Sequence, residues 1–264
     1  MKELKEKVVW ITGASSGIGE ALAYAFAREG AFLVLTARNG AKLEEVKTKC
    51  LQSTLKCWIQ PTDLLKLEKL PEVVNDVLRK TGGIDILVNN AGRSQRSMAK
   101  ETPLENDRSI MELNFFSTVA LTKMILPHMV NRQSGHLVVI SSITGKFGFP
   151  MRTAYSASKH AVQGFFESLR AELASDNIKV TIVSPGRINT NISVNALAAN
   201  GTSYNRMDEG QANGMPADQC ARLIIKAIRK NKKEILVGGT ELVMIYIRRL
   251  FPALFYRLVT KIKN

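Results

Sequence analysis

Short apolar runs alternate with amphipathic stretches along most of this 264-residue chain. Apolar runs bounded by polar or turn-forming residues are typical of buried strands. Seven such runs are present, at residues 8–11, 32–35, 56–59, 86–88, 136–140, 179–183 and 234–237.

Between these runs, apolar residues recur at the spacing of an amphipathic helix. The predicted helices span residues 18–29, 41–51, 70–80, 104–131, 155–175 and 217–230. Strands joined by helical crossovers favour a parallel sheet that is covered on both faces. Because such crossovers are right-handed, the sequence predicts one α/β domain of the doubly wound Rossmann type, with ligands at the carboxyl ends of seven strands.

Residues 241–264 depart from this alternation. Residues 241–250 are mostly apolar, and Pro252 can start a second helix. One face of that helix carries Phe251, Leu254, Phe255, Leu258, Val259 and Ile262, opposite Arg257 and Lys261. We therefore expect an amphipathic helical extension of a catalytic domain that spans residues 1–240. The extension is too short to span a bilayer but suits an anionic membrane surface. The alternative is that it covers the sheet edge or a dimer interface.

Charge is concentrated at the same end of the chain. The net charge is +14, and residues 222–264 hold 11 of the 37 Lys and Arg but only two of the 23 Asp and Glu. A nucleic-acid binder would usually show basic residues interleaved with aromatic ones, or a known motif, and the sequence has neither. We expect no nucleic-acid partner.

Cysteine and histidine give no sign of a metal. Cys50, Cys57 and Cys220 form no CxxC pair, and His128, His136 and His160 lack ligand spacing. Reduced thiols and packing or surface histidines are the simpler interpretation. The charged N-terminal residues leave no room for a signal peptide, and no uninterrupted apolar run approaches ~18 residues. We expect a cytoplasmic protein, with peripheral membrane contact as the alternative.

The first predicted strand runs into a glycine-rich turn, Thr12 to Glu20. Glycines allow a tight turn and close approach to a ligand, and the helix that follows offers free N–H groups to a phosphate. The cradle residues are Gly13, Ser15, Ser16, Gly17, Ile18 and Gly19. The turn therefore predicts a pyrophosphate site.

The end of the second predicted strand indicates which dinucleotide binds. NAD sites place a carboxylate there, whereas an Arg accommodates the 2′-phosphate of NADP. Here Ala37 is followed by Arg38 and Asn39, without a carboxylate. The sequence favours NADP or NADPH over NAD.

Tyr155 and Lys159 stand one turn apart on a predicted helix. A free phenol titrates near pH ~10, and an adjacent positive charge favours its ionised form. Tyr155 is therefore a candidate general acid/base.

Together these motifs resemble the single-domain short-chain dehydrogenase/reductase superfamily. The matching positions are Thr12 to Gly19, Asp63, Asn89-Asn90-Ala91-Gly92, Asn114, Ser141-Ser142, Tyr155-x-x-x-Lys159 and Pro185-Gly186. Residues 142–159 and 184–195 most resemble the member-seven branch. That branch includes an acyl/alkyl-dihydroxyacetone-phosphate reductase, and the 11β-hydroxysteroid dehydrogenases are a more distant likeness.

The resemblance implies a role for each matching residue. Tyr155 would protonate the carbonyl oxygen, Lys159 would bind the nicotinamide ribose and lower the pKa of Tyr155, and Ser142 would stabilise the alkoxide. Asn114 would hold a water, although a structural hydrogen bond is the alternative. The remaining coenzyme contacts would be Asp63, Leu64, Asn90, Ala91, Gly92, Pro185, Gly186, Ile188 and Thr190.

The resemblance also implies a substrate lid at residues 191–216 and a homodimer or homotetramer. The expected reaction interconverts an alcohol with a ketone or aldehyde. A hydrophobic carbonyl compound is one such substrate. A dinucleotide-binding scaffold or redox sensor without turnover is the alternative. It is disfavoured because all four catalytic positions hold competent residues.

Overall fold

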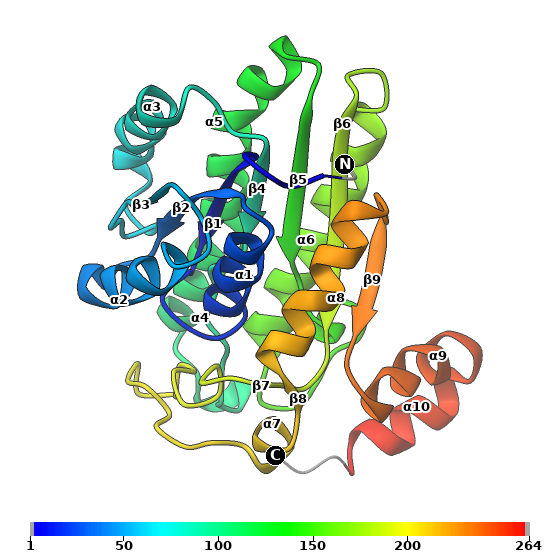
Figure 1. The fold of residues 1–264 in the computed structure, drawn as a ribbon. Helices are drawn as coiled ribbons and strands as arrows, with labels where there is room; N and C mark the ends of the chain where they lie inside the picture. Colours follow the sequence, from blue (N-terminus) through cyan, green and yellow to red (C-terminus); the bar gives the residue numbers. More distant parts are fainter. Residues whose placement is uncertain (1–2, 262–264) are drawn as a thin grey trace.

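A seven-stranded parallel sheet runs through the centre of the computed structural model, which describes residues 3–261 (Figure 1). Its order is β3-β2-β1-β4-β5-β6-β9. The strands are β1 (Val8–Thr12), β2 (Phe32–Thr36), β3 (Cys57–Ile59), β4 (Ile86–Asn89), β5 (Gly135–Ile140), β6 (Ile178–Pro185) and β9 (Glu234–Val237). The chain reverses its direction across the sheet between β1 and β4, and this is where α/β folds bind ligands.

Helices cover both faces of the sheet. Three of them, α1 (Gly17–Arg28), α2 (Gly40–Cys50) and α8 (Ala217–Arg229), contribute to one apolar core. On the other face lie α3 (Leu70–Thr81), α5 (Ser117–Asn131) and α6 (Thr153–Glu172), and α4 (Leu104–Met111) leads into α5. The predicted doubly wound fold is confirmed.

The first strand shows why the sheet needs two cores. Val9 and Ile11 belong to the core on the α1 face, whereas Val8 and Trp10 belong to the core on the opposite face. Successive side chains of a strand point to opposite faces, so a strand that is buried on both sides is mostly apolar. Trp10 keeps its one donor satisfied through a 2.8 Å hydrogen bond from Nε1 to Thr36 Oγ1.

All seven predicted strands and all six predicted helices are present, with ends that differ by at most three residues. Two features differ from the expectation. A π-helical turn, Glu112–Phe116, interrupts the helix predicted at 104–131. Residues 188–216 contain two paired two-residue strands, β7 (Ile188–Asn189) and β8 (Met215–Pro216), and a short helix, α7 (Glu209–Ala212). Elements this short carry no periodicity that a sequence could show.

After β9, residues 240–259 form what we call the C-terminal hairpin. It consists of a 3₁₀ turn (Thr240–Leu242), α9 (Val243–Leu250) and α10 (Pro252–Val259), and it projects from the side of the molecule (Figure 1). Pro252 begins α10 as expected. Only part of the apolar face predicted for this helix is buried: Phe255 is 2% exposed, whereas Phe251 is 61% exposed. Ile262 lies outside the described residues.

One helical stretch of the described chain, Leu104–Asn131, is long and apolar enough to cross a membrane by length and composition. Its residues Leu121, Ile125 and Met129 are buried in the core between α5 and the sheet. Such burial is the behaviour of a core helix.

His136 lies in the middle of the sheet, on β5, and is fully buried. Its Nε2 is 2.8 Å from Thr181 Oγ1, and its Nδ1 has no hydrogen-bond partner. Burial lowers the pKa of His136 to about 3, and the nearby charge of Lys179 adds to this effect. The residue is a packing histidine, as the sequence indicated, and it is neutral in the folded protein.

This burial predicts an acid-sensitive stability. The pKa of His136 is lowered on folding, so its contribution is fully present above the unfolded pKa of ~6.5 and is lost as the pH falls below that value. The loss amounts to about 1.4 kcal/mol per pH unit. Urea unfolding of wild type and His136→Gln between pH 7 and 4.5 measures it. The free energy of unfolding should fall less steeply with decreasing pH in His136→Gln than in wild type. In His160→Gln, which changes an exposed histidine, it should fall as in wild type. Equal slopes in all three proteins would contradict the assignment.

Candidate active site

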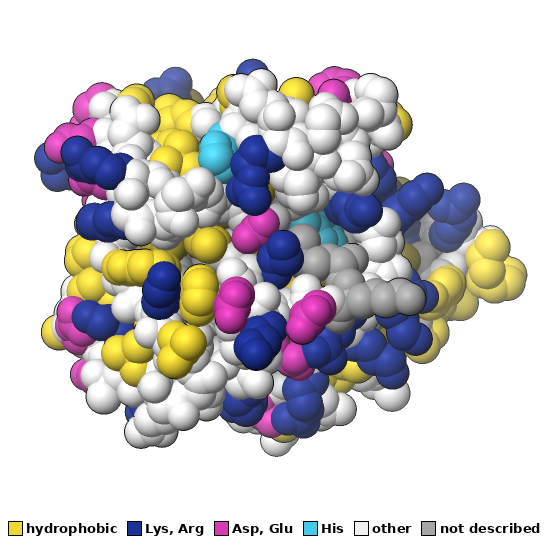
Figure 2. All heavy atoms as spheres, turned by 45° about the horizontal axis from the view of Figure 1, so that its top comes forward, with side chains coloured by type: hydrophobic (Ala, Val, Ile, Leu, Met, Phe, Trp, Pro, Cys, Tyr) yellow, Lys and Arg dark blue, Asp and Glu magenta, His cyan; other side chains and the backbone are white. Residues whose placement is uncertain are grey.

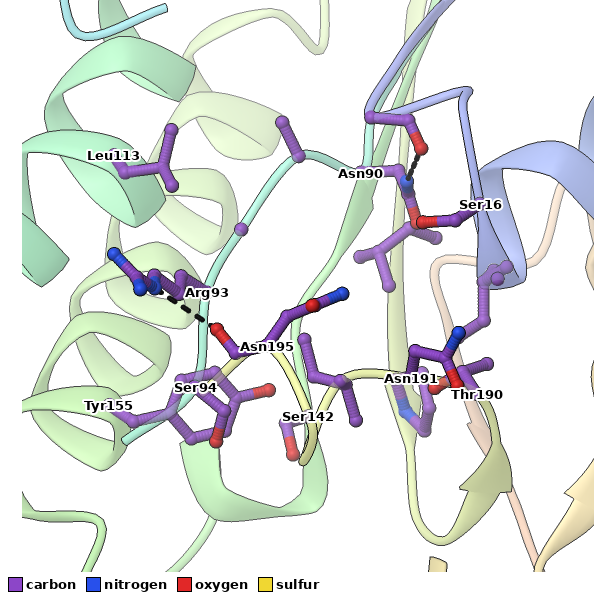
Figure 3. A pocket seen from close by; sticks show the side chains of 18 of the residues that line it. Ser16, Asn90, Arg93, Ser94, Leu113, Ser142, Tyr155, Thr190, Asn191 and Asn195 are labelled. Atoms are coloured by element: carbon purple, nitrogen blue, oxygen red, sulfur yellow. Dashed lines mark hydrogen bonds between the residues drawn. The ribbon is translucent and has the colours of Figure 1, made fainter. Parts of the chain in front are cut away.

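A cavity of about 850 Å³ opens at the carboxyl ends of the central strands. It is lined by all of the site residues predicted from the sequence except Gly19 and Asn114. Figure 3 shows Ser16 and Asn90 at one end of it and Tyr155 and Ser142 together at the other. The cavity is large enough for a dinucleotide and a small substrate to lie side by side.

The glycine turn after β1 has the geometry of a phosphate cradle. Gly13 and Gly17 have φ values of +65° and +60°, which only glycine adopts readily. A Cβ on Gly19 would lie 2.2 Å from the Gly13 carbonyl oxygen, so Gly19 supports the turn from behind rather than lining the cavity.

Asn90 clamps the same turn from the end of β4. Its Nδ2 donates to the carbonyl oxygens of Thr12 at 3.0 Å and Gly13 at 3.1 Å. Thr12 Oγ1 in return accepts from the backbone N–H groups of Asn90 and Ala91. The two loops that line this end of the cavity are therefore fixed to each other.

The residues present fit a dinucleotide. Helix α1 begins at Gly17 directly below the cavity, and its N-cap residue Ser16 makes no side-chain cap hydrogen bond. The free N–H groups and dipole of a helix N-terminus bind phosphate. Arg38 and Asp63 line the cavity at the carboxyl ends of β2 and β3, although Asn39 also caps α2 by accepting from Lys42 N at 3.0 Å.

Three predicted catalytic side chains meet at the other end. Tyr155 and Lys159 lie one turn apart on α6, and Lys159 Nζ is 5.8 Å from the centre of the Tyr155 ring. Lys159 Nζ donates to the Ile140 carbonyl at 2.8 Å, which ties α6 to the end of β5. Ser142 follows β5, accepts from Thr144 N at 3.1 Å, and lies beside Tyr155 (Figure 3).

The electrostatics around Tyr155 differ from the simplest expectation. Burial raises the pKa of Tyr155, and the neighbouring Ser142 hydroxyl and the charges of Arg96 and Arg152 oppose that rise. Burial also lowers the pKa of Lys159 to about 8. Two arginines that the sequence did not indicate thus favour the ionised phenol.

Asn114 lies in the π-helical turn, behind the cavity wall. Its Oδ1 accepts from Arg93 N at 2.8 Å, and its Nδ2 donates to Arg93 O at 3.0 Å and to Ser158 Oγ at 2.9 Å. Protein groups satisfy this buried amide, which matches the structural alternative for its role. A π-turn re-aims a helical side chain, and such turns are frequent at functional sites.

A buried charge cluster beside Tyr155 was not foreseen. The Asp208 carboxylate accepts from Arg96 Nε at 2.9 Å and from Arg152 Nη2 at 3.1 Å. Burial and the like charge of Arg96 lower the pKa of Arg152 to about 10, and Asp208 opposes this. Arg152 lies three residues before Tyr155, so the sequence could have indicated it. It could not have indicated Arg96 and Asp208, because only folding brings them together.

The segment predicted as a substrate lid, residues 191–216, covers one side of the cavity and is tied to it. Leu197 exchanges two backbone hydrogen bonds with the loop after β4, Arg96 N to Leu197 O at 2.9 Å and Leu197 N to Ser94 O at 2.8 Å. Arg93 Nε donates to the Asn195 carbonyl at 3.0 Å (Figure 3).

Residues 3–261 contain no group of three or more His, Cys, Asp or Glu that could hold a metal ion. The three cysteines are buried, free thiols.

Comparison with solved structures supports the fold. A short-chain dehydrogenase/reductase from Burkholderia phymatum, solved with NAD, superposes with a TM-score of 0.86 at 23% identity and covers 96% of both chains. An alcohol dehydrogenase from Thermococcus sibiricus, solved with 5-hydroxy-NADP, gives a TM-score of 0.76 at 24% identity, over 89% of this chain and 97% of that one.

Sequence comparison gives the family. The "Dehydrogenase/reductase SDR family protein 7-like" of Drosophila melanogaster is 45% identical over 98% of this chain and 81% of its own length. The mouse "Dehydrogenase/reductase SDR family member 7B" is 44% identical over 97% and 81%. These relatives confirm the likeness to the member-seven branch. The family pattern described as short chain dehydrogenase matches residues 7–201, and the chain belongs to this family of oxidoreductases.

Proposed function

We propose that the protein is an NADPH-dependent oxidoreductase that interconverts a ketone or aldehyde and an alcohol, with Tyr155 as general acid/base. The observation that carries this proposal is that Tyr155, Ser142 and Lys159 face the same cavity as the glycine cradle. A bound nicotinamide coenzyme supplies the hydride.

The protein's own residues bind, orient and move the proton. Ser142 donates a hydrogen bond to the substrate oxygen, and Tyr155 donates the proton that this oxygen needs when hydride arrives. Lys159 orients the nicotinamide ribose, and Asn114 holds the loop at Arg93. With its raised pKa Tyr155 is protonated at neutral pH, as a proton donor to the substrate oxygen must be.

The competing function is a dinucleotide-binding scaffold or sensor. It requires no proton donor in the cavity, so the phenol hydroxyl that faces the cavity would be idle. A panel of ketones, aldehydes and quinones mixed with NADPH, followed by coenzyme absorbance, separates the two and identifies the substrate class.

We expect Tyr155→Phe to bind NADPH normally but to lose turnover by about 10²- to 10⁴-fold, because only the proton donor is removed. Steady-state kinetics and a binding titration measure the two effects. Tyr24→Phe, which removes a phenol hydroxyl on α1 away from the cavity, is the control. A Tyr155→Phe enzyme that kept more than a tenth of kcat would rule out this mechanism.

The choice of NADPH over NADH is supported by Arg38, since a guanidinium suits the 2′-phosphate. Ala37→Asp with Arg38→Ala should shift preference towards NADH, because the new carboxylate repels that phosphate. Comparing kcat/KM for both coenzymes tests this, and Arg38→Lys, which keeps the charge, should retain part of the preference. A wild type that already prefers NADH would sink the proposal.

We also propose that residues 1–240 form the catalytic domain, that residues 191–216 select the substrate as a lid, and that residues 241–264 extend the same domain. A homodimer or homotetramer is supported by an apolar surface on α4 to α6. Leu104 and Phe116 are 57% and 45% exposed there, and Phe115 packs against Phe165 with ring centres 6.1 Å apart. Light scattering that gave a single 29.2 kDa particle at micromolar concentration would contradict assembly.

Peripheral membrane contact of a cytoplasmic protein is supported by the outer face of the C-terminal hairpin. Leu250 and Phe251 are 65% and 61% exposed, and Arg249, Arg257 and Lys261 are exposed beside them. Figure 2 shows basic and apolar side chains gathered on this projecting part, at the right. Exposed apolar groups with neighbouring cations suit an anionic lipid surface.

Cosedimentation with anionic vesicles at low salt tests this contact. Wild type should pellet, and Leu250→Ser with Phe251→Ser should pellet several-fold less, because the buried apolar area is removed. Leu55→Ser, at an 83% exposed apolar residue elsewhere, is the control and should pellet like wild type. Absence of pelleting by wild type, or equal pelleting of all three proteins, would show that the hairpin is no membrane anchor.

A further inference from the structure

The C-terminal hairpin lies directly behind two walls of the cavity. One wall is the loop after β6, from Pro185 to Ile188, and the other is the turn that carries Ser142. No residue of the hairpin lines the cavity itself. The hairpin therefore touches the site only through these two walls.

Glu241, in the first turn of the hairpin, holds the loop after β6. Its Oε1 accepts from Arg187 N at 2.7 Å and from Gly239 N at 3.1 Å. The preceding residue, Gly186, donates from its N–H to the Val237 carbonyl at 2.7 Å. Hydrogen bonds of backbone N–H groups to a carboxylate are about twice as strong as those to neutral acceptors.

Gly186 shows how closely the carboxylate lies against this loop. A Cβ built on Gly186 would lie 2.1 Å from Glu241 Oε1. The other side of the same loop, at Pro185, Gly186 and Arg187, faces the cavity. The Glu241 carboxylate thus fixes the position of this loop from the side that faces away from the cavity.

Phe255 fixes the hairpin that presents Glu241. It is 2% exposed and packs edge-to-face on Phe147, with ring centres 5.3 Å apart, in a cluster with Ile143. Ile143 follows Ser142 and also lines the cavity. A hairpin anchored in this way cannot move away from the loop without opening an apolar core.

We propose that Glu241 is a positioning residue for the coenzyme, holding the loop from Pro185 to Ile188 against the nicotinamide half of the dinucleotide. The proposal rests on the proposed function, because it assigns the nicotinamide to this end of the cavity. The adenosine half is held by the glycine cradle, Arg38 and Asp63, none of which contacts Glu241. Loss of Glu241 should therefore weaken one half of the coenzyme site and spare the other.

Two ligands separate the halves. NADPH spans the whole site, whereas adenosine 2′,5′-bisphosphate occupies only the adenosine half. We expect Glu241→Ala to raise the Kd of NADPH about tenfold, as the loss of a charged hydrogen bond does, and to change the Kd of the bisphosphate less than twofold. Glu241→Gln keeps a carbonyl oxygen that can accept from Arg187 N, and should recover most of the affinity. Glu172→Ala, at an exposed acid at the end of α6, is the matched control.

Each other outcome counts against the inference. A Glu241→Ala protein that binds NADPH like wild type would overturn it, and equal weakening of both ligands would overturn it by indicating general damage to the fold. Wild-type protein that binds NADPH no more tightly than the bisphosphate would also overturn it, because the nicotinamide half would then add no binding energy. If wild type bound neither ligand, the proposed function would fall together with this inference.

Discussion

Burial of the central sheet on both faces is the constraint on which the rest of the structure depends. Each strand must supply apolar side chains to two cores, as Trp10 and Ile11 do on β1. Few polar side chains are therefore buried within the strands, and the functional groups lie at the carboxyl ends of the strands. The glycine turn follows β1, Arg38 follows β2, Asn90 follows β4 and Ser142 follows β5, so one edge of the sheet collects almost all of the functional groups.

This constraint also explains how much the sequence could predict. Strands that are buried on both faces appear in the sequence as continuous apolar runs, and the functional residues come after these runs. The strands, the glycine cradle and the Tyr155–Lys159 pair could therefore be predicted. What could not be predicted depends on contacts between distant segments. The Arg96–Asp208 pair joins residues 112 apart, and Phe255, one of several apolar residues in its pattern, is the one that packing buries in α10. The π-turn at Asn114 adds no signal to the helical pattern that surrounds it.

Charge at the catalytic end is balanced rather than simply positive. Burial opposes ionisation of both Tyr155 and Lys159, so it raises the pKa of Tyr155 and lowers that of Lys159 to about 8. Two arginines favour the ionised phenol, and Asp208 cancels part of their charge while it fixes their position. Because Asp208 belongs to the segment that covers the cavity, the placement of that segment and the acidity of Tyr155 are linked.

The Asn90 clamp has a consequence for how the protein is made. A ribosome adds about 5–20 residues per second, so Asn90 is synthesised roughly 4–15 s after Gly13. Until then β1 lacks its neighbour β4 on one side, and the glycine turn lacks the amide that ties it down. During this interval the nascent chain carries an apolar strand with an unpaired edge, which exposes it to aggregation.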